Sequence, residues 1–334
     1  MNVAVIGSGS WGTVVAAMVA DHVRTSLWAR RPDSAVGMRE ERENKAYLPG
    51  IGLPESLEIT SDLGEALAGA DVVVMAVPSH GFRAVLEQAR DMVSPEAVIV
   101  SLSKGIERGT QLRMTQVAAE VLTTDAARIG VLTGPNLARE VALGQPAAAV
   151  VAASDADVAG MLQNLFMSPT FRVYTNPDVV GCEAAGALKN PMAIAAGMAH
   201  GLGYGDNSKA ALVTRALAEL TRLGVALGGV PLTFAGLAGM GDLVATCFSD
   251  QSRNRRVGIA LGRGQQLDEI VAEMQMVAEG VKSTEAILAL AARHEIEMPI
   301  AASVGAVLYD GKQAADMVEG LMAREAKAEL HGIE

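Results

Sequence analysis

The chain opens with the stretch that decides its fold, Val3-Ala4-Val5-Ile6-Gly7-Ser8-Gly9-Ser10-Trp11-Gly12-Thr13. The apolar residues before the glycines predict a buried strand, and a helical pattern follows them as far as Ala20. A G-x-G-x-x-G turn in this position is typical of dinucleotide-binding folds. Gly7 permits the tight turn, Gly9 lets a pyrophosphate approach the backbone, and Gly12 lets the helix pack closely against the strand. A glycine-rich turn without a ligand is the alternative.

A second strand pattern, Thr25 to Ala29, ends in Arg30-Arg31-Pro32. An NAD site would place Asp or Glu near this strand end, to accept a hydrogen bond from the ribose 2′-hydroxyl. Two arginines stand there instead, and guanidinium groups bind phosphates in bidentate fashion. The pair therefore favours a 2′-phosphate, and hence NADP. Two ordinary surface arginines are the alternative.

Strand and helix patterns alternate through the first half of the chain. This alternation predicts an α/β Rossmann-type fold with a doubly wound, mainly parallel sheet. The further strands are Asp71 to Val77, Ala97 to Ser101, Arg128 to Leu132, Ala147 to Ala153 and Phe171 to Tyr174. Ligands of such sheets bind beyond the carboxyl ends of the strands, so the loops to search follow Ile6, Ala29, Val77, Ser101 and Leu132.

Strand patterns end at about Asn176, where Asn176-Pro177 breaks the chain. Helical patterns then run through Asp178 to Ala199, Lys209 to Leu227 and Val281 to His294. We therefore expect two domains: a dinucleotide-binding Rossmann domain over 1–176, and an all-α substrate and catalytic domain over 177–334.

Composition indicates a cytoplasmic enzyme that acts on a small molecule. Half of the 334 residues are hydrophobic, yet no uninterrupted apolar run approaches the roughly 18 residues of a membrane span, and no signal peptide opens the chain. Cys182 and Cys247 form no disulfide framework or metal-binding spacing, so no metal is expected. The net charge of −11 argues against a nucleic-acid partner.

Lys189 is the strongest candidate for chemistry, because it stands in the small and apolar stretch Ala184 to Gly197. Desolvation lowers the pKa of a lysine toward neutrality, which suits a general base. Pro191 cannot donate to the carbonyl of Ala187, so the helix should kink just past the lysine. A lysine whose stem packs while its ammonium reaches water is the alternative.

A second polar group of residues lies further along the chain. Asp242 stands alone among apolar and small residues, so it should have a specific partner, although a helix N-cap is the alternative. Ser252-Arg253-Asn254 offers a hydroxyl, a guanidinium and an amide, a set suited to a phosphate ester. A solvated basic loop over Ser252 to Arg256 is the alternative there.

These motifs occur in order with others: Gly7 to Thr13, Ser103-Lys104-Gly105, Gly134 to Ala138, Leu188-Lys189-Asn190, Gly241-Asp242-Leu243 and Gln251 to Arg256. In this set the chain resembles the bacterial NAD(P)-dependent glycerol-3-phosphate dehydrogenase family over nearly its whole length. The resemblance implies a reversible reduction of dihydroxyacetone phosphate to sn-glycerol 3-phosphate, which supplies glycerophospholipid synthesis. NADPH is the implied cofactor, with NADH as the alternative. It also implies a homodimer, and a helical domain like the C-terminal domain of 6-phosphogluconate dehydrogenase.

Matched residue by residue, the resemblance implies that Lys189 transfers the proton and that Lys104 touches both substrate and cofactor, with Asn190 and Asp242 also catalytic. The implied substrate-binding residues are Lys104, Gly134, Asn136, Lys189, Asp242, Ser252, Arg253 and Asn254. The implied cofactor-binding residues are Gly7, Gly9, Ser10, Trp11, Gly12, Arg30, Arg31, Lys104, Ala138, Arg253, Val277 and Glu279.

The chain departs from the family pattern at two places. Asn136-Leu137 replaces the usual Ser or Thr followed by Phe, which changes the contact expected there, and Asn190-Pro191 replaces the commoner Asn-Val. Two other functions fit the broad pattern. One is a related reductase of a β-hydroxyacid or ketopantoate type, and the other is a non-catalytic NADPH-sensing module, which would not need a lysine in an apolar helix.

Overall fold

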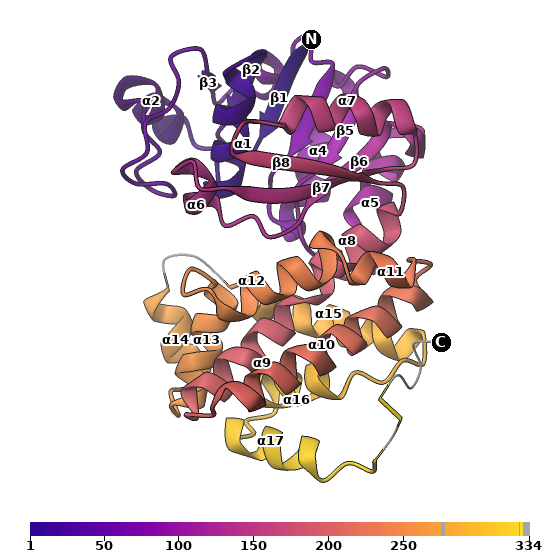
Figure 1. Ribbon diagram of the computed structural model, residues 1–334. Coiled ribbons are helices and arrows are strands. Elements are labelled where there is room, and N and C mark those ends of the chain that lie inside the picture. Colours follow the sequence, from indigo (N-terminus) through magenta and orange to yellow (C-terminus); the bar gives the residue numbers. More distant parts are fainter. Residues whose placement is uncertain (275–277, 327, 330–334) are drawn as a thin grey trace. The chain divides into compact units, whose positions relative to one another are not determined.

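The computed structural model describes residues 1–274, 278–326, 328 and 329, and it divides into two compact units (Figure 1). Unit 1 comprises Met1–Glu107 and Leu112–Val179, and unit 2 comprises Arg108–Gln111 and Val180–Glu334. The loop Arg108–Gln111 thus belongs to the second unit although it lies within the first half of the chain. Its Arg108 pairs with Glu285 of that unit.

Unit 1 is built on one eight-stranded sheet with the strand order β3-β2-β1-β4-β5-β6-β7-β8. Neighbouring strands are parallel except β6 and β7, which are antiparallel. The doubly wound, mainly parallel sheet is therefore confirmed. The strands are β1 (Asn2–Ile6), β2 (Arg24–Trp28), β3 (Glu58–Thr60), β4 (Val72–Met75), β5 (Val98–Ser101), β6 (Ile129–Thr133), β7 (Ala147–Ala153) and β8 (Phe171–Asn176).

Helices cover both faces of this sheet, and alternate residues of a strand enter the two cores. Val3 and Val5 of β1 pack on one side, whereas Ala4 and Ile6 pack on the other. Such two-sided burial explains why the central strands read as continuous apolar runs. The first side is covered by α1 (Ser10–Ala20), α2 (Pro32–Glu41) and α7 (Ala156–Phe166), and the second by α3 (Leu63–Leu67), α4 (Ser79–Ala89) and α5 (Met114–Leu122). Short elements complete the unit: η1 (Arg90–Met92), η2 (Ala126–Arg128) and α6 (Ala138–Ala142).

Unit 2 is helical throughout its described part and is organised around α9, whose residues from Asn190 to Ala199 are all buried. Helices α10, α12, α13, α15 and α16 contact α9. The helices are α8 (Val179–Leu188), α9 (Asn190–Gly201), α10 (Asp206–Ala226), α11 (Pro231–Phe234), α12 (Asp242–Phe248), α13 (Arg253–Gly262), α14 (Leu267–Glu273), α15 (Glu279–Arg293), α16 (Pro299–Tyr309) and α17 (Ala314–Met322), with a π-helical turn η3 (Leu237–Gly241) before α12.

The helical stretch expected over Asp178 to Ala199 is two helices. Helix α8 ends at Leu188 and α9 begins at Asn190, so the interruption falls on Lys189 itself and not just past it. Pro191 explains the break, since it has no N–H to donate to the carbonyl one turn earlier and its ring clashes there. The lysine therefore stands at a junction between two buried helices.

One described segment, Pro231–Phe248, is long and apolar enough to cross a membrane by length and composition, with a mean hydropathy of 1.3. It is not one regular α-helix, because α11, η3 and α12 follow one another within it. It also carries Asp242, which is 2% exposed and paired with Lys189. A buried ion pair and an irregular backbone are features of a segment within a folded helical unit, and 39% of this segment is buried.

Candidate active site

The glycine turn between β1 and α1 has the geometry that its sequence predicts. Gly7 has φ of +122°, and its N–H donates to the carbonyl of Trp28 at 3.1 Å. A Cβ atom on Gly12 would lie 2.1 Å from the carbonyl oxygen of Gly7, so only glycine allows α1 to begin this close to the strand end. The turn is thus closed by backbone packing.

The outer side of the same turn is open. A Cβ atom at Gly9 would meet nothing within 4 Å, and α1 begins at Ser10 without a side-chain cap. The indole Nε1 of Trp11 is buried and has no hydrogen-bond partner in the described part of the chain. The first turn of a helix offers N–H groups and a partial positive charge to anions. An open glycine, an uncapped helix start and an orphaned donor together fit a dinucleotide.

Ser10 is partly committed elsewhere. Its hydroxyl donates to the carbonyl of Tyr47 at 2.7 Å, so in this arrangement the oxygen can accept a hydrogen bond but has no proton left to donate. Asn44 ties the same loop to the turn, through the carbonyl of Ser8 and the hydroxyl of Thr13. The loop after α2 therefore forms one wall of the turn.

Arg30 and Arg31 follow β2 and are exposed. Arg31 is the N-cap residue of α2, which begins with Pro32. Neither side chain has a hydrogen-bond or ion-pair partner among the residues that the structure describes. Both guanidinium groups therefore have donors to offer to a ligand. Their solvent exposure limits what each contact can contribute.

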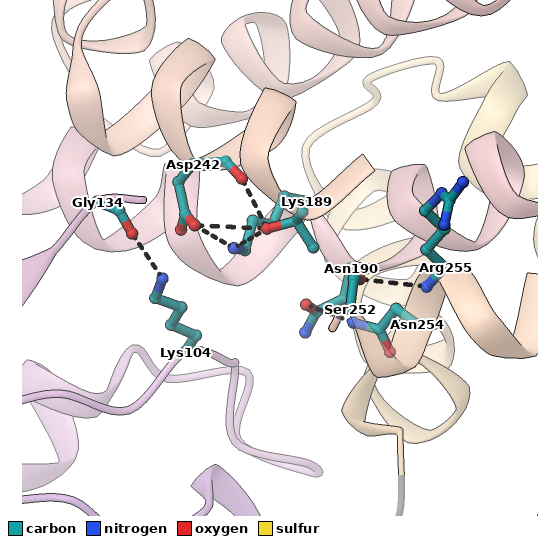
Figure 2. Close-up of polar contacts among 9 residues, drawn as sticks. Lys104, Gly134, Lys189, Asn190, Asp242, Ser252, Asn254 and Arg255 are labelled. Carbon is teal, nitrogen blue, oxygen red and sulfur yellow. Dashed lines mark hydrogen bonds and ion pairs between the residues drawn. The ribbon is translucent and has the colours of Figure 1, made fainter. Parts of the chain in front are cut away.

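The loops after β5 and β6 are joined by Lys104, whose Nζ donates to the carbonyl of Gly134 at 3.1 Å (Figure 2). Gly134 has φ of +131°. Close by in sequence, both polar atoms of the Asn136 side chain and the hydroxyl of Thr133 are buried, and none has a partner within the described ranges. Buried amides are normally hydrogen-bonded, so this loop has polar capacity suited to a ligand. Ala138 is the first residue of α6, just after these groups.

In unit 2, Lys189 and Asp242 form a buried ion pair, with only 5% and 2% of each residue exposed (Figure 2). Lys189 stands at the junction of α8 and α9, and Asp242 is the first residue of α12. The ammonium also donates to the hydroxyl of Thr246, which in turn donates to the carbonyl of Asp242 at 2.6 Å. An adjacent carboxylate favours the ammonium over the amine. The lysine is thus held charged, in place and largely out of water.

The geometry excludes the two alternatives for this pair. The side chain of Lys189 is 6% exposed, so its ammonium does not reach out into water. Gly241 is the residue at the N-cap position of α12, and the carboxylate of Asp242 points to Lys189 instead of capping the helix.

Asn190 and Asn254 form a second buried pair beside the first. The amide Nδ2 of Asn254 donates to Oδ1 of Asn190 at 2.9 Å, and Oδ1 of Asn254 accepts from the backbone N–H of Gly280 at 2.9 Å. The Nδ2 of Asn190 is buried and has no partner among the described residues. This donor is therefore available to a ligand.

The start of α13 replaces the solvated loop that was the alternative for Ser252 to Arg256. Ser252 caps this helix by accepting from the N–H of Arg255 at 3.2 Å. Arg253 and Arg256 are exposed, whereas Arg255 is buried and pairs with Asp250. Of the three residues suggested for a phosphate ester, Ser252 and Asn254 are buried and Arg253 is the accessible charge.

The remaining sequence predictions concern two cofactor-binding residues near the start of α15 and the two cysteines. Val277 lies outside the described residues, and Glu279 is the first residue of α15. Cys182 and Cys247 are both free and buried, and burial raises the pKa of the Cys247 thiol to about 12. No group of metal-ligating side chains occurs among the described residues.

Sequence reasoning missed Thr246 and Gly280. Thr246 lies four residues after Asp242 on one helix face, which was a usable signal. The contact of Gly280 with Asn254 left no mark in the sequence near either residue.

A glycine turn open to a dinucleotide, followed by a helical unit with a buried lysine–aspartate pair and an unpartnered amide donor, defines a nicotinamide-dependent oxidoreductase. The family models named NAD-dependent glycerol-3-phosphate dehydrogenase N-terminus and C-terminus match residues 2–159 and 178–319. The chain belongs to this family, so the resemblance of its motifs is confirmed.

Relatives support the same conclusion over the full chain. The chain is 54% identical over 331 residues to glycerol-3-phosphate dehydrogenase (NAD(P)+) 2 of Sphingopyxis alaskensis, with 99% of each chain covered. It is 53% identical to the enzyme named glycerol-3-phosphate dehydrogenase (NAD(P)+) in Thermobifida fusca, again covering 99% of each.

Solved structures agree with this assignment. The crystal structure of glycerol-3-phosphate dehydrogenase from Coxiella burnetii is 37% identical, with a TM-score of 0.92 and coverage of 97% of this chain and 99% of that one. A ketopantoate reductase from Ralstonia eutropha, 16% identical with a TM-score of 0.61, shares the fold alone.

Proposed function

We propose that the protein reduces dihydroxyacetone phosphate to sn-glycerol 3-phosphate with NADPH, reversibly, and so supplies glycerophospholipid synthesis. The observation that carries this proposal is the buried Lys189–Asp242 pair beside the unpartnered amide donor of Asn190. Reduction of a ketone requires a proton and donors at the oxygen that becomes negative, and these residues supply both. The relatives' names supply the substrate.

The proton comes from Lys189. When bound, NADPH supplies the hydride that adds to C2 of the ketone. As negative charge develops on the C2 oxygen, the ammonium of Lys189 stabilises it and gives it a proton, and in the reverse direction the amine accepts one. Asp242 and Thr246 orient the lysine through the contacts described above. The Nδ2 of Asn190 donates to the same oxygen, and fixed donors of this kind are usually the largest catalytic contribution.

The remaining site residues position the substrate and cofactor. Arg253, with Ser252 and Asn254, holds the phosphate and so fixes C2 for reaction. Lys104, Gly134 and Asn136 contribute to substrate binding, and Lys104 also touches the cofactor. The family usually has the hydroxyl of Ser or Thr at position 136. The amide of Asn136 offers both a donor and an acceptor there, so it can still bind a hydroxyl of the substrate.

The glycine turn and the arginines after β2 would hold NADPH. Gly7, Gly9 and Gly12 with the start of α1 would bind the pyrophosphate, and Arg30 and Arg31 the 2′-phosphate. Trp11, Ala138, Arg253, Val277 and Glu279 complete the proposed contacts. The open side of Gly9 and the orphaned indole N–H of Trp11 support this arrangement.

A turnover assay tests the proposal. Absorbance at the NADPH band should fall when dihydroxyacetone phosphate is added, and should stay constant with dihydroxyacetone, which lacks the phosphate. Ketopantoate and 2-keto acids test the alternative reductases. Oxidation of NADPH by a keto acid and not by the phosphorylated ketone would refute the proposal, and absence of turnover with every substrate would indicate a sensor.

We further propose that the enzyme works in the cytoplasm as a homodimer. The net charge of −11 favours solubility, and the dimer rests on the family resemblance. Light scattering coupled to size-exclusion chromatography should give a mass near twice the 34.6 kDa of the chain. A monomer mass across a wide range of concentrations would refute it.

A further inference from the structure

We propose that Asn254 is a positioning residue that sets the orientation of the Asn190 amide, and that the backbone N–H of Gly280 fixes this orientation. The inference rests on the proposed function only for what Asn190 does to the substrate. It adds to the direct phosphate contact of Asn254 a second role, exerted through another side chain. Figure 2 shows Asn254 and Asn190 joined by their hydrogen bond.

The orientation of the Asn254 amide follows from donor and acceptor polarity. A backbone N–H can only donate, so the atom of Asn254 that faces Gly280 must be its oxygen, as the 2.9 Å contact has it. The other end of that amide is then its nitrogen, which can only donate. Asn190 must therefore turn its oxygen toward Asn254, and its own Nδ2 is left facing away. One fixed donor thus determines the orientation of two amides.

Burial makes the alternative arrangement costly. Asn190 is 4% exposed and Asn254 is 8% exposed, and Gly280 is also buried. Turning Asn254 over would set its Nδ2 against the N–H of Gly280, and its oxygen against the oxygen of Asn190. Buried polar groups without a partner are strongly disfavoured, so both amides should hold one orientation.

Gly280 is required for this contact by its size. A Cβ atom at this position would lie 2.7 Å from Oδ1 of Asn254 and 2.9 Å from Cδ1 of Ile194. Only glycine lets the first turn of α15 approach the amide this closely. The start of α15 therefore controls the amide pair through one peptide group.

The consequence for the reaction follows from the sign of the charge. A negative oxygen is stabilised by the Nδ2 donor of Asn190 and would be repelled by its Oδ1 acceptor. Asn190 can assist only in the orientation that Asn254 selects. A change at Asn254 should therefore act on the chemical step through Asn190.

Selective ¹⁵N-asparagine labelling tests this chain of contacts from Gly280 through Asn254 to Asn190, called the relay below, without any turnover. In Asn254→Asp the new carboxylate can only accept, so the Asn190 amide should turn and donate to it. One side-chain amide proton of Asn190, identified by its loss in Asn190→Ala, should move downfield and exchange more slowly with solvent. Unchanged Asn190 signals in a folded Asn254→Asp protein would overturn the proposal.

Gly280→Ala provides a second variant that leaves both amides intact. It displaces Asn254 from the N–H of Gly280, and the Asn190 signals should shift or double as the fixed polarity is lost. Gly160→Ala in α7 is the matched control, since a Cβ there meets nothing within 4 Å. If Asn254→Asp fails to fold, unchanged Asn190 signals in folded Gly280→Ala refute the relay.

Kinetics then separate positioning from direct binding. Loss of one such donor costs about 10²- to 10³-fold in kcat, so Asn254→Asp should lower kcat by about 10²-fold with the KM for NADPH unchanged. In the Asn190→Ala background the same change should lower kcat at saturating substrate only about threefold or less, since coupled residues do not add. Its effect on the KM for the phosphorylated ketone, which reports the direct phosphate contact, should persist there. Additive losses in kcat would mean that Asn254 acts on the chemical step without Asn190 and would overturn the inference. Wild-type protein without turnover would refute the proposed function, while the amide signals would still decide the relay.

Discussion

Lys189 and Asp242 form an ion pair almost entirely removed from water, and the desolvation of two charges can exceed their attraction. A buried pair of this kind is therefore weak evidence of a stabilising role. The hydroxyl of Thr246 adds a polar partner to the pair, and the unpartnered amide of Asn190 belongs to the residue that follows Lys189 in sequence. At this scale the arrangement is better explained by proton transfer than by stability.

Lys189→Met tests this explanation, because it keeps the length of the side chain and removes the charge. Turnover should fall by at least about 10³-fold, since both the proton donor and a fixed positive charge are lost. The variant should also be less stable by roughly 3 to 5 kcal/mol, because Asp242 is left as an uncompensated buried charge. Thermal melting and NADPH binding would establish that it folds.

The double variant Lys189→Met with Asp242→Asn separates the two effects. Removal of both charges should restore most of the lost stability and none of the turnover. Recovery of turnover in the double variant would show that the lysine is structural and not catalytic.

We predict that single side chains also decide cofactor choice. Replacing Arg30 and Arg31 by Ala should weaken NADPH and leave NADH almost unchanged, because only NADPH carries the 2′-phosphate. Each exposed contact is worth about 1 kcal/mol, and less at high salt. The NADPH-to-NADH ratio of kcat/KM should therefore fall roughly tenfold to thirtyfold at one fixed salt concentration. An unchanged ratio would make these arginines ordinary surface charges.

Sequence identified single residues best where their neighbours made them conspicuous. Lys189 and Asp242 each stood as a lone charge among apolar and small residues, and the structure pairs them. Thr246 was missed although it lies one helical turn after Asp242, because its contact with Lys189 spans 57 residues of chain. Gly280 was missed because its peptide group, and not a side chain, makes the contact.

At the scale of elements, the crossing of α9 and α13 is made by glycines on both helices. A Cβ atom at Gly258 would lie 2.0 Å from the carbonyl oxygen of Ile194, and one at Gly197 would lie 2.2 Å from that of Arg255. The two backbones are therefore in direct contact. This crossing joins the helix that begins at Asn190 to the helix that carries Asn254.

Gly258→Ala should consequently separate the two helices. Overpacking of a core typically costs about 1 to 3 kcal/mol, and we expect at least the upper end, because the clash is with backbone and has no side chain to yield. Gly160→Ala is the control, in a helix where added bulk meets nothing. There alanine should be neutral or slightly stabilising. Equal melting temperatures for Gly258→Ala and wild type would contradict this account.

Helices and strands were predictable where their burial produces a recognisable hydrophobic pattern in the sequence. The central strands read as apolar runs because both of their faces are covered, whereas β3, with only Glu58–Thr60, was too short to show one. The break at Lys189 was anticipated from Pro191, although it falls one residue earlier than expected. The antiparallel placement of β7 was not visible, because strand direction depends on pairing between distant segments.

At the scale of the whole molecule, the chain forms two compact units. The loop Arg108–Gln111 belongs to unit 2, although the segments on both sides of it belong to unit 1. Sequence anticipated a Rossmann half and a helical half, but it did not indicate this exchange of a loop. The pairing of Arg108 with Glu285 depends on contacts 177 residues apart. Such contacts are set by tertiary packing and leave no local pattern.

Stability of the molecule should depend on pH through Glu219, which lies in α10 and is 2% exposed. Its carboxylate accepts from the N–H groups of Ile300 and Ala301 at the start of α16, at 2.7 and 3.3 Å. Burial nevertheless raises the pKa of Glu219 from 4.5 to about 7, and these two hydrogen bonds oppose that shift. The folded protein thus keeps a proton that the unfolded chain releases.

The sign of the effect follows from proton linkage. Between about pH 4.5 and 7 the folded state binds more protons than the unfolded state, so the free energy of unfolding falls as pH rises through this window. The contribution of Glu219 is complete below about pH 4.5 and is lost above about pH 7. A shift of this size corresponds to at most about 3 kcal/mol.

Glu219→Gln stays neutral at every pH and retains an oxygen that accepts a backbone N–H, so it should lack this dependence. Melting temperatures of both proteins at pH 5 and pH 8 isolate the difference from the titration of other groups. From pH 5 to pH 8 the wild-type protein should lose stability relative to Glu219→Gln. A gain would mean that Glu219 is ionised in the folded state, because its hydrogen bonds to α16 outweigh the effect of its burial.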